Sequence, residues 1–291
     1  MNWMKYRILY FAISAIVIGA GIFGLVRWGL NFGVDFKGGA SLEYKFEKSI
    51  STEAVQGKIE DKGVEVTSIQ DISGGAYLIK LRSISQKERQ GIKGVLEEAS
   101  GGAVEELRFE NVGPSIGPEL IKKTFYALAI AAGGILIWVS LQFKSLKFGV
   151  SAVLATLHDS LVLIGGFALL GHFFGAEIDF LFVTAALTIL SFSVHDTIVV
   201  YDRIRESQRR LGGNIFELSN KAITETMVRS LNNSFTIIFM LVALVLLGGT
   251  TIKWFAIALL IGTISGTYSS PFVAVPLLVT WEEIQKRLKR S

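Results

Sequence analysis

Six long stretches of the 291-residue sequence are almost free of charged side chains, and they limit the possible folds more than any other feature. About 20 apolar residues make a helix that crosses the roughly 30 Å hydrocarbon layer of a membrane. Four stretches carry no charge, and the other two each contain a His-Asp pair. A soluble core would not supply four separate uncharged runs of this length. The predicted spans are residues 8–26, 124–143, 148–170, 180–201, 231–249 and 254–280.

Composition supports a membrane protein and excludes several other classes. The chain is 51% hydrophobic and 19% charged, whereas soluble domains are typically ~25% charged. It has no Cys, which rules out disulfides, a thiolate nucleophile and Cys-ligated metal sites. Its three His residues are scattered and fit no metal-ligand spacing. We therefore expect no catalytic residues, no cofactor and no bound metal.

The basic surplus of the chain is unevenly distributed. Residues 28–121 have a net charge of −4, so the rest of the chain, which is mostly apolar, has +8. The short loops and termini on one side of the predicted membrane carry 13 Lys and Arg, and those on the other side carry only Lys253. Because Lys and Arg concentrate in cytoplasmic loops, both termini are predicted to be cytoplasmic. The location of the Lys and Arg surplus in cytoplasmic loops explains the positive net charge, so nucleic acid is not an expected partner.

The segment between the first two spans is predicted to be a small extracytoplasmic domain. Strands are expected at 40–46, 64–70, 76–82 and 103–109, with a hairpin turn at residues 73–75. Helices are expected at 51–62, capped by Ser51, and from a capping box at Ser85 and Glu88 to about residue 99. The order βαββαβ is that of the ferredoxin-like fold. Such a domain contains no nucleophile–base set and is expected to bind extended polypeptide or another domain, with strands 40–46 and 76–82 as candidate edges.

The predicted fold is thus a polytopic α-helical membrane protein with six transmembrane helices and one extracytoplasmic α+β ferredoxin-like domain. The predicted parts are residues 1–27 (N-terminus and first span), 28–123 (outer domain), 124–280 (the other five spans) and 281–291 (a basic cytoplasmic tail). Residues 203–230 are expected to form a basic loop with an amphipathic helix at the membrane surface.

Ionisable residues inside the spans are the main functional signal, because each costs at least ~2.5 kcal/mol on insertion scales. In the fourth span, Thr184, Thr188, Ser191 and His195 follow helical spacing and form one polar stripe, with Asp196 about 100° round from it. This arrangement indicates either a group that binds a transported ion or a structural polar contact between helices.

The fifth span carries a matching polar pattern. Thr226, Arg229, Asn233 and Thr236 follow spacings of 3, 4 and 3 on a helix antiparallel to the fourth. Asp196 and Arg229 are therefore predicted to lie at similar depth. Two further sets of candidate positions are His158 and Asp159 in the third span and the small residues of the sixth span. For the latter, close helix packing is expected at Gly262, Gly266, Ser269 and Ser270.

Four separated segments resemble the SecF family of protein translocase subunits, which lies within the resistance–nodulation–division superfamily. They are FGVDFKGGASLEY (32–44), NVGPSIGPEL (111–120), SVHDTIVVYDRIRE (193–206) and GTYSSPFVAVPLL (266–278). The resemblance implies that Asp196 takes part in ion coupling and that Arg229 and the His158-Asp159 pair occupy family positions. The family usually has Asn where this chain has His195, which leaves open whether His195 shares the proton.

The resemblance also implies partners and a location. These are a separate SecD chain, the SecYEG translocon with YajC or YidC, translocating polypeptide and lipid, in the cytoplasmic membrane of a bacterium or archaeon. The implied function is protein export driven by the proton or sodium gradient. Two alternatives stay open: a small-molecule or lipid exporter of the same superfamily, and a translocon scaffold that conducts no ion.

Overall fold

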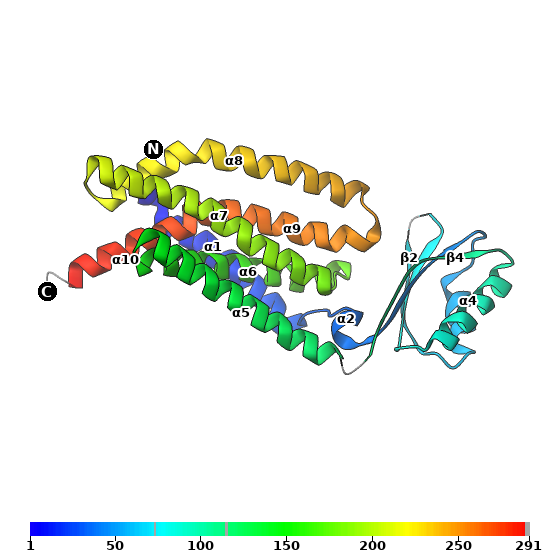
Figure 1. Ribbon diagram of the computed structural model, residues 1–291. Helices are drawn as coiled ribbons and strands as arrows, with labels where there is room; N and C mark the ends of the chain where they lie inside the picture. The colour runs from blue at the N-terminus through cyan, green and yellow to red at the C-terminus, as the bar shows by residue number, and fades with distance from the viewer. Residues whose placement is uncertain (73, 114–115, 289–291) are drawn as a thin grey trace. The chain divides into compact units, whose positions relative to one another are not determined.

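The computed structural model describes residues 1–72, 74–113 and 116–288 of the chain (Figure 1). The chain divides into two compact units, residues 1–31 with 126–291, and residues 32–125. Helices are the elements of the first unit over its described residues, and the second unit holds the sheet. The predicted turn residue Ser73, residues 114–115 of the family-like segment 111–120, and the last three residues of the tail lie outside the described residues.

Six helical stretches among the described residues are long and apolar enough to cross a membrane, which confirms the predicted spans. A short 3₁₀ turn, η1 (Trp3–Tyr6), precedes the first of them. The helices are α1 (Arg7–Trp28), α5 (Ile116–Phe143), α6 (Leu146–Phe174), α7 (Phe180–Leu211), α8 (Ile215–Leu247) and α9 (Thr250–Ser269), the last continued by a π-helical turn η2 (Ser270–Ala274) and by α10 (Val275–Leu288).

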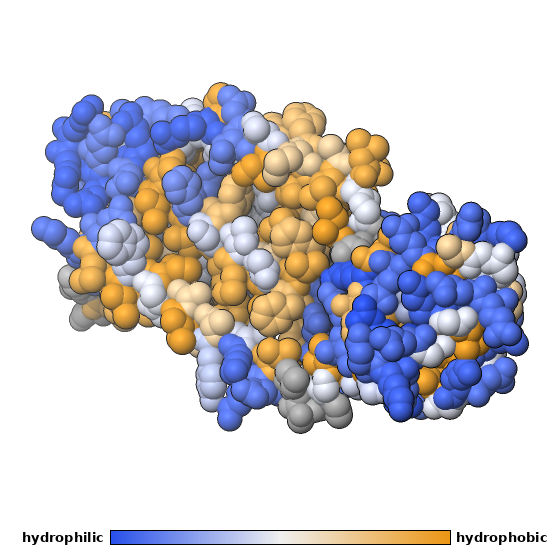
Figure 2. Space-filling view, turned by 45° about the vertical axis from the view of Figure 1, so that its right-hand side comes forward, coloured by the Kyte–Doolittle hydropathy of each residue, from blue (hydrophilic) through white to orange (hydrophobic). Residues whose placement is uncertain are grey.

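The prediction of a loop and a surface helix over 203–230 is wrong. α7 continues through Leu211, and α8 begins at Ile215, so the two form a helical hairpin joined by Gly212-Gly213-Asn214. The predicted spans 180–201 and 231–249 are bounded by the nearest charged residues, but a helix can continue beyond the apolar part of its sequence. Glu206 pairs along α7 with Arg203 and Arg210, three and four residues away, and such pairs support helix in water. Figure 2 shows hydrophilic residues gathered at this end of the bundle and apolar ones along its length.

Close approaches at glycine let the helices pack tightly. A Cβ on Gly262 of α9 would lie 2.1 Å from the side chain of Ile189 on α7, and one on Gly266 would lie 3.2 Å from Ser193. α1 and α6 cross at Gly21 and Gly165, where a Cβ on either would lie under 3 Å from the other's backbone. α9 packs against α6, α7 and α8, so its small residues sit at the centre of the bundle.

The second unit has the ferredoxin-like fold. Its strands β1 (Gly39–Phe46), β2 (Val66–Ile72), β3 (Ala76–Leu81) and β4 (Val104–Val112) form an antiparallel sheet in the order β2-β3-β1-β4. Helices α3 (Thr52–Glu60) and α4 (Gln86–Ser100) pack on each other and complete the core, and a short helix α2 (Val34–Lys37) precedes β1. The alternation predicted in the first strand is real: Ala40, Leu42, Tyr44 and Phe46 point into the core.

The predicted helix caps of this unit are present. The Ser51 hydroxyl accepts the Ala54 N–H, and Ser85 and Glu88 form the capping box at the start of α4. The backbone at Gly38 and Gly39 has φ of 78° and 133°, which glycine adopts without strain and which turns α2 into β1. Two details differ from the prediction. β2 begins two residues later than expected, and strands 40–46 and 76–82 are the central ones, because the sheet order leaves β2 and β4 at the edges.

Candidate functional site

Asp196 lies buried on α7 where that helix packs against α8. Asp196 is 5% exposed, and the Ser230 hydroxyl of α8 donates a hydrogen bond to its Oδ2 at 2.5 Å. Ser270, at the π-helical turn, is close enough to interact with the same carboxyl. The Ser270 hydroxyl also shares a hydrogen bond of 2.9 Å with Thr197 of α7. The carboxyl therefore sits where α7, α8 and the break in the last span meet.

Asp159 on α6 is fully buried and has a different environment. Its carboxylate accepts hydrogen bonds from the hydroxyls of Ser193 (2.6 Å), Ser265 (2.5 Å) and Ser269 (2.6 Å). Nδ1 of His158 lies 3.0 Å from Oδ1. A carboxylate has about four acceptor positions, so this one is saturated. Three helices, α6, α7 and α9, are tied to a single side chain.

His158 extends this network to α1. Its Nε2 lies 3.0 Å from the hydroxyl of Ser14, and the residue is 8% exposed. The predicted His-Asp pair is therefore in direct contact, and it links the first span to the middle of the bundle. Hydroxyl groups rather than a basic residue of another helix surround it.

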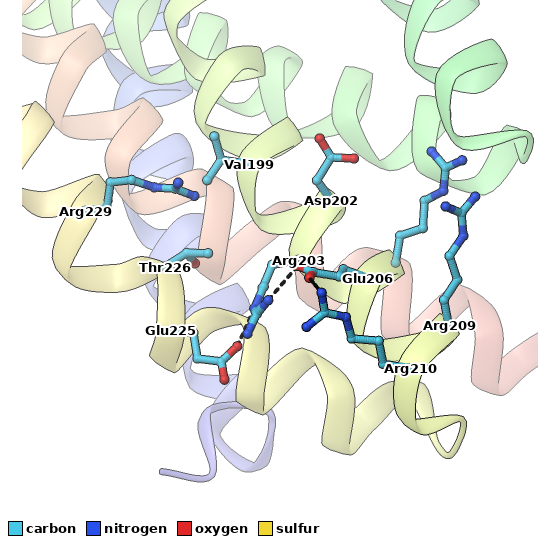
Figure 3. Close-up of a pocket in the computed structure, with 10 residues that line it drawn as sticks. Val199, Asp202, Arg203, Glu206, Arg209, Arg210, Glu225, Thr226 and Arg229 are labelled. Atoms are coloured by element: carbon cyan, nitrogen blue, oxygen red, sulfur yellow. Dashed lines mark hydrogen bonds and ion pairs between the residues drawn. The ribbon is translucent and has the colours of Figure 1, made fainter.

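Arg229 does not pair with Asp196 in this structure. Among the described residues no carboxylate lies within ion-pair distance of its guanidinium, and the residue is exposed. Its side chain lies in a cavity of about 920 Å³ between α7 and α8, extending toward Val199 (Figure 3). Arg229 nevertheless lies at a depth similar to that of Asp196, because its neighbour Ser230 on α8 donates to the Asp196 carboxyl.

The polar stripe predicted on the fourth span faces outward. Thr188, Ser191 and His195 are exposed on α7, as Asn233 is on α8. Thr188 satisfies its hydroxyl within its own helix by donating to the Thr184 carbonyl at 2.8 Å. Asp196 points inward and His195 outward, so the two neighbours face different surroundings.

The small residues of the last span do more than pack. Gly262 and Gly266 lie against α7, as described above, whereas Ser269 and Ser270 contribute hydroxyls to the Asp159 and Asp196 environments. The partners that the sequence did not reveal are all hydroxyl residues within apolar helices: Ser14, Ser193, Thr197, Ser230 and Ser265. The available signal was that hydroxyl residues recur at the helical positions facing each buried carboxylate.

The described residues contain no group of three or more His, Cys, Asp or Glu that could hold a metal ion. A carboxyl surrounded by hydroxyls can bind and release a proton, and it can hold helices in register. Fold and site together define a class: a multi-pass membrane protein with ionisable groups inside its bundle, which is typical of transport proteins.

Comparison with known proteins identifies the family. Residues 92–284 match the family described as protein export membrane protein SecD/SecF, C-terminal, and residues 26–50 match the SecD/SecF GG motif. The chain belongs to the SecD/SecF family. It is 43% identical to protein translocase subunit SecF of Thermobaculum terrenum, with 96% of this chain and 93% of that protein covered.

Longer relatives match over a part of their length. Protein translocase subunit SecDF of Bacillus subtilis is 30% identical over 97% of this chain and 38% of its own. The crystal structure of SecDF from Thermus thermophilus, a translocon-associated membrane protein, superimposes with a TM-score of 0.83 at 31% identity, covering 97% of this chain and 39% of that one. The protein is therefore an accessory membrane subunit of the Sec export machinery. Its GG motif corresponds to Gly38 and Gly39, the turn that leads into β1.

Proposed function

We propose that the chain works with a separate SecD partner in the cytoplasmic membrane, and that the pair uses the proton or sodium gradient to promote export of polypeptides. The relatives named SecDF, of which this chain matches 38 to 39%, support association with SecD. Contacts with SecYEG and with YajC or YidC belong to the same proposal and rest on the family resemblance. Both termini are cytoplasmic, and the ferredoxin-like unit faces the other side.

Asp196 is the ion carrier in this proposal. The observation that supports it most directly is a buried carboxyl that accepts a hydrogen bond of 2.5 Å from Ser230, beside a cavity that contains the Arg229 guanidinium, which has no ion pair among the described residues. Ionised Asp196 attracts Arg229, and protonated Asp196 does not. Proton binding can thus change how α7 and α8 pack against each other. Asp159, with three hydroxyl donors and the His158 ring in contact, holds the bundle together instead.

The energy available limits how many ions are needed. One charge moved through ~100 mV yields ~2.3 kcal/mol, so ~150 mV yields ~3.5 kcal/mol. Shifting a two-state equilibrium from 1:99 to 99:1 requires ~5.5 kcal/mol. One proton at that potential is too little, and two are enough. A second carrier in SecD would supply the difference.

The exposed stripe of Thr188, Ser191 and His195 on α7, with Asn233 on α8, suggests where SecD binds. Polar side chains that face hydrocarbon are unfavourable and are normally turned toward a bundle interior or an aqueous cavity. A partner that covers this face removes them from lipid.

The test is gradient-dependent export in membrane vesicles that contain this chain and SecD. Asp196→Asn is expected to leave assembly with SecD intact and to abolish the stimulation of export by the gradient, and Arg229→Met to do the same. His195→Asn, which introduces the family's usual residue, serves as the matched control and should retain activity. If Asp196→Asn exports normally while His195→Asn is inactive, His195 is the carrier. If all three variants export normally, the chain is a scaffold that conducts no ion.

A further inference from the structure

The cavity between the joined ends of α7 and α8 is strongly basic. It is lined by five arginines and three carboxylates, so it carries a surplus of two positive charges. Only Arg229 of this set takes part in the proposed ion coupling. The lining residues are Val199, Asp202, Arg203, Arg205, Glu206, Arg209, Arg210, Glu225, Thr226 and Arg229.

Two of the three carboxylates are already occupied by cations. Arg203 binds Glu225 and Glu206, and Arg210 binds Glu206 at 2.9 Å, as Figure 3 shows. Arg209 and Arg229 have no ion pair among the described residues. The cavity thus presents unpaired guanidinium groups, and guanidinium groups bind phosphate oxygens through parallel hydrogen bonds.

An apolar face of α8 leads directly to this cavity. Its large apolar side chains are spaced by 3 or 4 residues, as one face of a helix requires, and each is at least 36% exposed. In a membrane such a face lies against acyl chains. Val228, at the cavity end of this face, is the neighbour of Arg229. The residues of the face are Val228, Leu231, Phe235, Phe239, Val242 and Leu246.

The cavity lies on the membrane side that holds the N-terminus. Trp3 Nε1 donates to the Thr224 hydroxyl at 2.9 Å, and the Met4 N–H donates to Asn220 at 2.8 Å. Both partners lie on α8 just before the cavity residue Glu225. A lipid of that leaflet can therefore place its chains along the apolar face and its headgroup among the arginines.

We propose that this cavity binds the phosphate group of an anionic phospholipid from the leaflet on the side of the N-terminus. Basic pockets between membrane helices are suited to such headgroups. Free inorganic phosphate offers the same oxygens to the arginines, but it gains nothing from the apolar face of α8. The proposal concerns a lipid site and does not depend on whether Asp196 carries an ion.

The test titrates the full chain in mild detergent with phosphatidylglycerol, and separately with phosphatidylcholine of the same acyl chains, and counts bound lipids by native mass spectrometry. The variant Arg209→Gln/Arg210→Gln leaves Arg229 intact. With about 1 kcal/mol per basic residue and about 1.4 kcal/mol per tenfold in affinity, it should weaken the first phosphatidylglycerol site about 30-fold. Arg209→Gln alone breaks no ion pair within the described part of the chain and should weaken that site about fivefold.

The control Lys286→Gln/Arg287→Gln on α10 removes the same charge elsewhere and should change the affinity less than about threefold. Phosphatidylcholine binding should not respond to any of these variants. Equal losses in both double variants would overturn the proposal, because they would indicate general attraction by the basic end. Displacement of the lipid by millimolar inorganic phosphate would overturn it in favour of a free-anion site. Unchanged lipid affinity with loss of SecD association would overturn it in favour of a protein contact.

Discussion

At the scale of single residues, two buried carboxylates in one bundle have opposite surroundings. Asp159 accepts hydrogen bonds from Ser193, Ser265 and Ser269 and contacts His158, so all its acceptor positions are engaged. Asp196 is held by Ser230 and lies near the cavity with Arg229. A carboxylate with every position filled gains little by moving, and one held by few partners can exchange them. This contrast is the basis for proposing Asp196 as the ion carrier and Asp159 as a carboxylate that holds the helices together.

This contrast predicts that Ser269→Ala destabilises the membrane-spanning unit. It removes one donor from a fully buried carboxylate, and hydrogen bonds to charged groups contribute about 1.5–3 kcal/mol. Thermal unfolding of the purified chain in detergent should show a melting temperature several degrees lower. Ser160→Ala is the matched control, since the one hydrogen bond of the Ser160 hydroxyl among the described residues goes to the Thr156 carbonyl of its own helix. Equal melting of the two variants would contradict the assigned role of Asp159.

At the scale of elements, one charged cluster joins helix α4 to strand β4 in the ferredoxin-like unit. Arg89 of α4 donates from Nε to Glu106 of β4 at 3.0 Å, and its guanidinium lies 4.1 Å from the ring centroid of Phe109. The Tyr44 hydroxyl of β1 donates to the same carboxylate at 3.3 Å. The hydrogen bonds from Arg89 lower the pKa of Glu106, although burial opposes this.

A pKa lowered by folding predicts stability that is lost in acid. Glu106 stabilises the fold above its unfolded pKa of about 4.3, and this contribution disappears as the pH falls through the lower folded value. A cysteine at buried Val55 reports opening of the unit through its reaction with 4,4′-dithiodipyridine, which proceeds in acid. At pH 7 this cysteine should react much more slowly in the chain with Glu106 than in the chain carrying Glu106→Gln. Below about pH 4.3 the two reaction rates should approach each other. A ratio that stays constant from pH 7 to pH 3 would show that the cluster contributes nothing.

At the scale of the whole molecule, the membrane topology determines what each unit can contact. The ferredoxin-like unit can meet an exported polypeptide only if it faces away from the cytoplasm. Its free strands for such a contact are β2 and β4, since β1 and β3 are paired on both sides. The proposed orientation puts the basic end of α7 and α8 in the cytoplasm, as the distribution of Lys and Arg predicts.

Single cysteines test this topology in a chain that has none. Ser85 caps α4, so a cysteine there would disturb the fold. Thr67 on β2 and Gln208 on α7 are better positions for the cysteine, because both are exposed and neither side chain caps a helix. Thr67→Cys should react with an impermeant maleimide in intact spheroplasts. Gln208→Cys should react only after the membrane is permeabilised. The reverse pattern would invert the topology and would be incompatible with the proposed export function.

The sequence by itself determined the six spans, the order of strands and helices in the ferredoxin-like unit and the caps at Ser51 and Ser85, because these follow from local periodicity and from neighbours a few residues apart. It also located Asp196 and Asp159 as unusual. Only the tertiary structure decided that Ser269, 110 residues away, donates to Asp159 and that His195 faces outward. It also decided that α7 extends to Leu211. The reason is physical: a hydrogen bond between distant helices depends on how they are rotated and shifted against each other, and that is set by packing over the whole bundle.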